Sequence, residues 1–358
     1  MLHPGPLVAA GALDISLEPD AAPALDLAAA ADAGIHAFLR AAWFGAAASG
    51  ARLRTLVACR SPGGEPIAAI PLAERRMGPL TLKEVPGSYW PYRSFPLARD
   101  AGEDELAALL SAPEARAALG RAWRIGPVYA DDPTAARLAA AARLSGWTIL
   151  TRRLATCYVV DLAGLAAAGP WPAAKTLRKN RWLERRLAEA GELDFTTVGG
   201  GQWDPAVFDL LAAIEADSWV AKKADARDTK FLAPESRRVW ERAVGDPVIA
   251  DMLSCSILRV GGVPAAFTFS LRCGATLYFI ANSYSERFAE SSPGRILLYR
   301  DLQAAAAGGV TKVGWGAGDP GYKSEMGAEP GPAILDHLIV RGAVAAALAR
   351  PLWRSRGG

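Results

Sequence analysis

The stretch that decides the fold is residues 252–281, MLSCSILRVGGVPAAFTFSLRCGATLYFIA. It holds three apolar runs, Met252–Val260, Pro264–Arg272 and Thr276–Ala281, separated by Gly261-Gly262 and by a short segment around Cys273-Gly274. A two-residue Gly-Gly link is typical of a tight hairpin, because glycine readily adopts the positive φ that such turns require. The stretch therefore predicts three consecutive antiparallel strands.

The residues that follow predict a helix and a further strand. After the loop Asn282–Pro293, a helix is expected over Gly294–Ala307, ended by Gly308-Gly309. Val310–Trp315 predicts a fourth strand, and the glycine-rich segment Gly316–Gly327 comes next. Antiparallel strands followed by a helix and another strand indicate an α+β domain with a mostly antiparallel sheet.

The first half of the chain predicts a separate α/β unit. Residues 24–47 show helical spacing of apolar side chains and predict one long helix. Trp147–Leu154 and Cys157–Leu162 predict two short strands at the end of this unit. We therefore expect a first domain over residues 1–165, a length that can bury its own core.

A second domain is expected over residues 166–358. It begins near Trp171-Pro172, because proline is tolerated in the first turn of a helix, and a helix is expected over Ala173–Ala190. The last apolar stretch, Ala333–Val340, predicts a strand of this second domain.

Composition narrows the class of protein. The 358 residues are 51% hydrophobic, yet no window approaches 18 uninterrupted apolar residues, and the N-terminus lacks a cationic region before an apolar stretch. The four cysteines are scattered, which predicts neither a zinc site nor a disulfide framework and favours the reducing cytoplasm. A net charge of +3 argues against a general nucleic-acid binder.

One candidate ligand site lies at the start of the expected helix 294–307. A helix N-terminus presents unpaired N–H groups and a partial positive charge, which suits phosphate. Hydroxyl groups, a glycine that allows close approach and an arginine with fork geometry stand together there. An ordinary capped helix explains the same residues equally well. The residues of this segment are Ser291, Ser292, Pro293, Gly294, Arg295 and Ile296.

A second candidate site is the glycine-rich segment after the expected strand 310–315. Asp319 could act as a general base or orient an amine nucleophile, and Tyr322 could donate a proton to a leaving thiolate. Lys323 could hold a phosphate or a developing oxyanion. The alternative is a glycine-rich turn capped by an aspartate, with an exposed lysine.

Two further segments are candidates for binding an acceptor or an anion. Arg178, Arg181 and Arg185 share one face of the helix expected over 173–190, although a solvated face paired with Glu184 and Glu189 is the favoured interpretation. The aromatic loop 87–96, which contains Tyr92 and Arg93, could line an apolar channel or close the core. No cluster of His, Asp or Glu has metal spacing, and no motif of a serine or cysteine hydrolase is present.

Together these motifs resemble the GNAT branch first named for bacterial cellulose-biosynthesis acetyltransferases. That branch is similar in build to the Fem-type peptidoglycan peptidyltransferases and to some bacterial ceramide synthases. The resemblance implies two tandem GNAT-like domains, an N-terminal degenerate one and a C-terminal one with the acyl-CoA site, each a mostly antiparallel mixed sheet flanked by helices. The motifs that carry it are Val159–Leu162, Arg178–Leu187, Ser218-Trp219, Gly261–Ala266, Ser292–Leu297, Gly318-Asp319 and Tyr322-Lys323.

The resemblance also implies a chemistry. An acyl-CoA donor would place its pantetheine between splayed strands near Ala281 and residues 312–315, and its pyrophosphate at Ser292–Ile296. The acceptor would be an amine or a hydroxyl, either of a lipid long-chain base or of a glycan, with Trp219 among its contacts and no metal involved. The Arg/Gln-x-x-Gly-x-Gly/Ala loop of simple GNAT enzymes is absent from this sequence.

Two other functions stay open on the sequence. Aminoacyl-tRNA-dependent peptidyl transfer of the Fem type is one, and a non-catalytic GNAT-like binding module is the other. For the acyltransferase we expect a cytoplasmic protein with a small-molecule or lipid-like acceptor, scope for peripheral membrane contact and no nucleic-acid partner.

Overall fold

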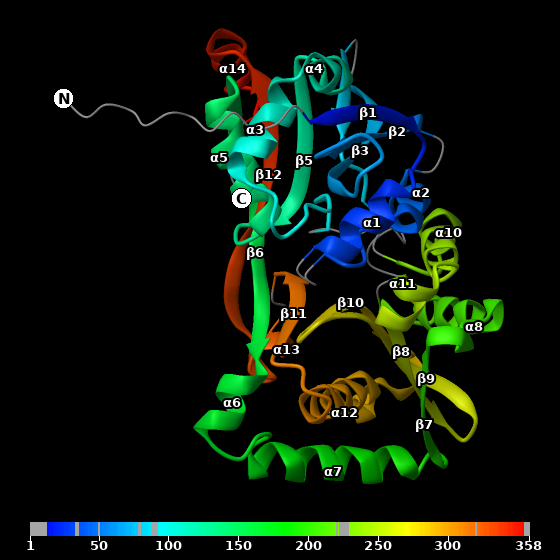
Figure 1. Cartoon of the computed structure of the whole chain (residues 1–358). Coiled ribbons are helices and arrows are strands. Elements are labelled where there is room, and N and C mark those ends of the chain that lie inside the picture. The colour runs from blue at the N-terminus through cyan, green and yellow to red at the C-terminus, as the bar shows by residue number, and fades with distance from the viewer. Residues whose placement is uncertain are drawn as a thin grey trace. The chain divides into compact units, whose positions relative to one another are not determined.

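The computed structural model of the chain describes residues 13–32, 36–48, 51–77, 80–87, 92–219, 221, 229–318 and 321–353. The chain divides into two compact units (Figure 1). Unit 1 comprises Met1–Leu154 with Ala333–Gly358, and unit 2 comprises Ala155–Pro332. Each unit is a mostly antiparallel mixed sheet flanked by helices, which confirms the predicted fold class.

Unit 1 builds its sheet in the order β1-β2-β3-β4-β5-β12. Neighbouring strands pair antiparallel except β4 and β5, which pair parallel through Lys83–Trp123 and Glu84–Arg124. In chain order the elements are β1 Asp14–Pro19, α1 Ala24–Ala31, α2 Ala41–Ala47, β2 Leu53–Cys59, β3 Pro66–Met77, β4 Leu80–Glu84, α3 Glu103–Ser111, α4 Pro113–Leu119, β5 Ala122–Tyr129, α5 Pro133–Leu144, the first part of β6 Trp147–Asp161, the last part of β12 Glu329–Arg341, and α14 Ala343–Ala349.

Unit 2 builds its sheet in the order β7-β8-β9-β10-β11-β6. Here too a single pair of neighbours, β10 and β11, is parallel. The elements are the end of β6, α6 Leu162–Ala168, α7 Ala174–Ala188, β7 Leu193–Gly199, the short helix η1 Gly200–Gln202, α8 Pro205–Ala216, α10 Pro234–Ala243, α11 Pro247–Met252, β8 Leu253–Val260, β9 Val263–Cys273, β10 Thr276–Tyr284, the short helix η2 Glu286–Ser291, α12 Pro293–Ala307, β11 Lys312–Ala317, α13 Tyr322–Glu325 and the start of β12.

The last strand of each sheet comes from a distant part of the chain. In unit 1, β5 pairs with residues 334–340 of β12, near the C-terminus. In unit 2, β11 pairs with residues 157–161 of β6, which precede all its other strands in sequence. The structural division therefore differs from the boundary expected at 165/166, since Ala333–Gly358 groups with the N-terminal unit through the β5–β12 pairing.

Two predicted elements differ from the structure. The single helix expected over 24–47 is two helices, α1 and α2, because the backbone is extended at Asp32 (ψ 152°) and again at Arg40 (ψ 171°). The two strands expected over 147–154 and 157–162 are one strand, β6. Ala155-Thr156 between them contains no glycine or proline, so nothing in the sequence breaks the extended backbone.

The sheet of unit 2 packs helices on both faces. On one face, Leu183 and Leu187 of α7 and Ile296 and Leu297 of α12 share a core cluster with Ala266. Since successive strand residues point to opposite faces, Phe267 lies on the other side, where its ring meets Phe231 at 5.5 Å. The cluster with Phe231 also includes Phe208, Phe269 and Trp240, so α8 and α10 cover this second face.

Among the described residues, no helix is long and apolar enough to cross a membrane.

Candidate acyl-donor site

The central feature of unit 2 is the separation of two parallel strands. β10 and β11 pair at Thr276–Lys312, Leu277–Val313 and Tyr278–Gly314, and their pairing ends there. Both strands continue, β10 to Tyr284 and β11 to Ala317. The register of β10 against β9 shifts between Phe279 and Ala281, so a bulge lies where the separation starts. Bulges bend a strand and end its pairing, and here the edge of β10 from Phe279 onward that faces away from β9 has no partner among the described strands.

Two buried polar groups flank this separation without a hydrogen-bond partner among the described residues. One is the indole N–H of Trp315 on β11, whose ring packs against Phe279 at 5.3 Å on the α12 face. The other is the hydroxyl of Ser283 on β10, which pairs in register with Phe267 and so faces the α8 side. Buried polar groups are nearly always hydrogen-bonded, so both are candidates for contacts to a bound ligand. Ser283 is not among the sequence-predicted site residues, because the strand predicted there ends at Ala281.

The start of α12 lies just beyond the end of β10 in the chain. Ser292, the residue before the helix, has a left-handed backbone (φ 52°) and makes no side-chain cap. The amides of Arg295 and Ile296 both donate to its carbonyl oxygen, at 3.1 and 3.2 Å. Pro293 has no N–H, and the amide of Gly294 has no partner among the described residues. A single free N–H, rather than a full ring of them, is therefore available to an anion at this helix start.

Gly294 is explained by packing as well as by the proposed ligand. A Cβ built on Gly294 would lie 3.1 Å from Cδ1 of Tyr284, so the ring of Tyr284 needs the space. Because Gly294 has no side chain, α12 can pack closely against Tyr284 of β10. This packing role was not predicted from the sequence.

Arg295 reaches from α12 to the segment after β11. Its guanidinium forms an ion pair with Glu325 of α13, at 2.7 Å, and lies over the ring of Tyr299 at 5.4 Å from the ring centre. Glu325 is exposed, and ion pairs of exposed carboxylates are worth about 1 kcal/mol or less. The pair can therefore yield to a stronger anion, and the buried Nε of Arg295 has no partner in the described structure.

The segment after β11 combines a structural lysine with an aromatic wall. Lys323 is buried, and its ammonium donates to the carbonyl oxygens of Trp315 (2.8 Å), Ala317 (3.1 Å) and Gly318 (2.7 Å). These bonds occupy the three N–H donors of the ammonium, so Lys323 holds the end of β11 in place instead of presenting its charge to an oxyanion. The alternative interpretation, an exposed lysine at a glycine-rich turn, is therefore wrong for Lys323.

Of the two other predicted catalytic residues, the structure describes Tyr322 but not Asp319. The ring of Tyr322 packs edge-on against Trp315 at 5.7 Å, which places it beside the separated strands. Asp319 lies outside the described residues, and its role as general base stays a prediction.

The three arginines predicted to share a face of α7 do so. Arg178, Arg181 and Arg185 are exposed and line one groove of about 850 Å³. None of them forms an ion pair with another described residue. Glu184, the partner expected for them, pairs with Arg300 of α12 instead, at 3.0 Å.

The aromatic and cationic residues proposed for the acceptor lie in both units. Tyr92 is buried in the core of unit 1, with its ring 5.2 Å from Phe38 and 6.2 Å from Trp43, so it closes the core rather than lining a channel. Arg93 in the same unit is largely buried, and burial lowers its pKa even though Glu84 opposes the shift. Trp219, beyond the end of α8, is exposed.

Comparison with known proteins agrees with this geometry. Residues 174–324 match the family model described as acetyltransferase (GNAT) domain. No curated protein matches the chain. Among solved structures, FemX has a TM-score of 0.60 at 12% identity, covering 91% of this chain and 97% of its own.

Two other solved structures are similar over most of this chain. L-PGS from Bacillus licheniformis has a TM-score of 0.54 at 13% identity, with 94% of this chain and 96% of that one covered. A conserved protein of unknown function from Bacteroides thetaiotaomicron VPI-5482 has a TM-score of 0.55 at 12% identity, with 91% and 100% covered. At these identities the likeness concerns the fold. Residues 174–324 thus match the model of a GNAT acetyltransferase domain, and most of the chain is similar in fold to FemX.

Proposed function

We propose that unit 2 transfers an acyl group from a CoA thioester to an amine or hydroxyl acceptor. The observation that carries this proposal is the end of β10–β11 pairing at Tyr278–Gly314, together with the unpartnered amide of Gly294 and the guanidinium of Arg295 at the start of α12. An extended strand edge without a partner accepts an extended amide chain by β-type hydrogen bonds, and pantetheine contains two amides. A phosphate-bearing end suits the helix start.

The proposal assigns residues to each part of the acyl-CoA donor. The diphosphate lies at Gly294 and Arg295, with Ser291 and Ser292 as hydroxyl donors. The pantetheine follows β10 past Ala281, and the thioester carbonyl lies near the bulge at Ile280, where unpaired N–H groups can stabilise negative charge on oxygen. The unpartnered indole N–H of Trp315 supplies a further donor from β11.

The chemical step is direct transfer. The acceptor nitrogen or oxygen attacks the thioester carbon, the new C–N or C–O bond forms, and the C–S bond breaks. Asp319 takes the proton that the nucleophile loses, and the CoA thiolate leaves and is protonated, with Tyr322 as the nearest predicted acid. Lys323 contributes as a positioning residue, because it holds the carbonyl groups at the end of β11.

The acceptor is proposed to be an amine of a lipid long-chain base or of a glycan, approached from the α8 face near Trp219. The exposed arginines of α7 offer a surface for an anionic part of donor or acceptor. Localisation in the cytoplasm with peripheral membrane contact is consistent with this acceptor class and remains a proposal.

The test is thiol release from acetyl-CoA and from a long-chain acyl-CoA in the presence of an amine panel, with mass spectrometry of any co-purified ligand. Asp319→Asn is expected to lower turnover by at least 100-fold, and an exposed control, Asp209→Asn, is expected to leave it unchanged. Wild-type turnover in Asp319→Asn would show that Asp319 is not the general base. No binding of any acyl-CoA would remove the acyl-transfer proposal and favour a non-catalytic binding module.

A second function is aminoacyl-tRNA-dependent transfer of the Fem type. It is favoured by the fold likeness to FemX and by the unpaired arginines on the exposed face of α7. Activity that requires aminoacyl-tRNA and disappears after ribonuclease treatment would select this function over the CoA-dependent one.

A further inference from the structure

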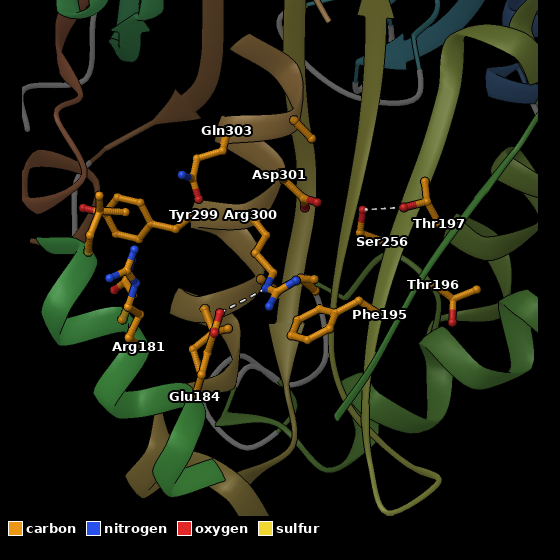
Figure 2. A pocket seen from close by; sticks show the side chains of 15 residues that line it. Arg181, Glu184, Phe195, Thr196, Thr197, Ser256, Tyr299, Arg300, Asp301 and Gln303 are labelled. Atoms are coloured by element: carbon orange, nitrogen blue, oxygen red, sulfur yellow. Dashed lines mark hydrogen bonds and ion pairs between the residues drawn. The ribbon is translucent and has the colours of Figure 1, made fainter. Parts of the chain in front are cut away.

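A second pocket lies on the α7 side of unit 2, away from the separated strands. Figure 2 shows it between α7, β7, β8 and α12. Its volume is about 460 Å³, and none of its lining residues belongs to β10 or β11. A small organic ligand fits a volume of this size, since ligand pockets usually measure a few hundred cubic ångströms.

Asp301 of α12 contributes a carboxylate to the lining of this pocket. Its carboxylate accepts hydrogen bonds from the hydroxyls of Thr268 and Ser256. Burial raises the pKa of Asp301 to about 6, and the two hydroxyl bonds only partly oppose the shift. At neutral pH the side chain is therefore mostly ionised. Among the described residues, no lysine, arginine or histidine forms an ion pair with it. Carboxylates removed from water are normally paired with a cation, so this one lacks its usual partner.

The α7 wall carries an acceptor without a hydrogen-bond partner in the described structure. Asn180 of α7 is 8% exposed and lines the same pocket. Its Oδ1 is buried and has no hydrogen-bond partner among the described residues. The hydroxyls of Thr197 and Ser256, 3.4 Å apart, stand beside Asp301 as further acceptors. Asp301, Asn180 and Ser256 thus offer three acceptors to a ligand that carries N–H or O–H groups.

Arg300, the residue before Asp301 in the chain, is not its counterion. Arg300 pairs with Glu184 at 3.0 Å, and its guanidinium lies over the ring of Phe195 at 3.7 Å. In Figure 2 its side chain reaches toward Glu184 while Asp301 points toward Ser256. Arg300 and Glu184 satisfy each other, which leaves the charge of Asp301 for the ligand.

We propose that this pocket binds the ammonium group of a small aliphatic amine, with Asp301 as its counterion and Asn180 and Ser256 as additional acceptors. An ammonium has three N–H donors, which matches three acceptors on different walls. The alkyl part lies against the apolar lining, Phe195, Leu297 and Ala304. An uncharged polyol would satisfy the hydroxyl-rich lining but would leave the carboxylate without a cation. The proposal does not depend on the acyl-transfer reaction.

The experiment compares two molecules of equal length, 1,5-diaminopentane and 1,5-pentanediol, by titration calorimetry on the full chain at pH 7.5. The diamine is expected to bind in a one-to-one ratio, and the diol at least tenfold more weakly. Asp301→Asn, a nearly isosteric change, is expected to weaken diamine binding at least tenfold. Asn180→Leu on the other wall is expected to weaken it several-fold, so the outcome does not depend on one variant.

A matched control separates this pocket from non-specific attraction. Asp209 is an exposed carboxylate on α8, and Asp209→Asn is expected to bind the diamine as the wild type does. Equal affinity for diamine and diol, no measurable diamine binding, or an unchanged affinity in both Asp301→Asn and Asn180→Leu would overturn the proposal.

Discussion

Tyr278 of β10 and Gly314 of β11 are the last residues paired in the only parallel ladder that the structure describes in unit 2. Beyond them the strands separate, and each presents a buried polar side chain that its described neighbours do not satisfy, Ser283 on one face and Trp315 on the other. The start of α12 follows β10 closely, with Arg295 available in its first turn. An unpaired strand edge followed by a helix start with an arginine favours one elongated ligand over several small ones.

The role of Lys323 predicts a loss of stability on substitution. Lys323→Met keeps the volume but removes three charge-assisted hydrogen bonds to carbonyl groups, so we expect the free energy of unfolding to fall by about 3 kcal/mol. Urea unfolding measures this change. Lys179→Met, on the exposed side of α7, serves as the control and should change stability by less than about 0.5 kcal/mol. If Lys323→Met unfolds as the wild type does but loses turnover, the ammonium acts on the reacting groups instead.

Asp301 predicts a dependence of stability on pH. Its folded pKa, about 6, lies above the ordinary value of 3.8 because burial disfavours the charged form. Its contribution to stability is therefore fully present below about pH 4 and is lost as the pH rises through about 6, by at most about 3 kcal/mol. Asp301→Asn removes this dependence. The free energy of unfolding of the variant minus that of the wild type should therefore be more positive at pH 7.5 than at pH 4.5. Urea unfolding without ligand measures this difference.

The comparison for Asp301 is again Asp209→Asn, whose carboxylate is exposed. That variant should differ from the wild type by the same small amount at both pH values. An equally constant difference for Asp301→Asn would show that its carboxyl titrates as an exposed group does.

The backbone at Ser292 predicts a stabilising substitution. A non-glycine residue in the left-handed region costs about 1 kcal/mol, and Ser292 makes no capping bond in return. Ser292→Gly should therefore raise the free energy of unfolding by about 1 kcal/mol. Ser291 has no such backbone, so Ser291→Gly should be neutral or destabilising by about 0.5–1 kcal/mol. Destabilisation by Ser292→Gly would mean that its hydroxyl, not its backbone, determines the conformation.

The local parts of the fold follow from the sequence, and the distant pairings do not. The hairpin at Gly261-Gly262 was predictable because both residues have the positive φ, 56° and 79°, that the turn chemistry requires. The pairing of β12 with β5 could not be predicted, since an apolar strand such as Ala333–Val340 carries no sign of which sheet it joins. Strand pairing over such separations depends on the complete fold.

The same distinction holds for the candidate sites. The shared face of Arg178, Arg181 and Arg185 follows from helical spacing alone. For Tyr92 the sequence left two interpretations open, because a proline- and aromatic-rich loop can line a channel or close a core, and only the structure shows that its ring fills the core of unit 1. Asp301 was missed because an acid within a helix is ordinary in sequence. Only the packing of α12 against β8 and β9 shows that its carboxylate faces inward.

If the start of α12 holds the diphosphate of CoA, titration calorimetry will distinguish CoA from pantetheine, which lacks the diphosphate. Arg295→Ala should weaken CoA binding about tenfold, the size of one lost charge-assisted contact, and leave pantetheine binding unchanged. Glu325→Ala frees the same guanidinium and should keep or improve the affinity for CoA. Equal effects of Arg295→Ala on both ligands, or no effect on CoA, would contradict the account.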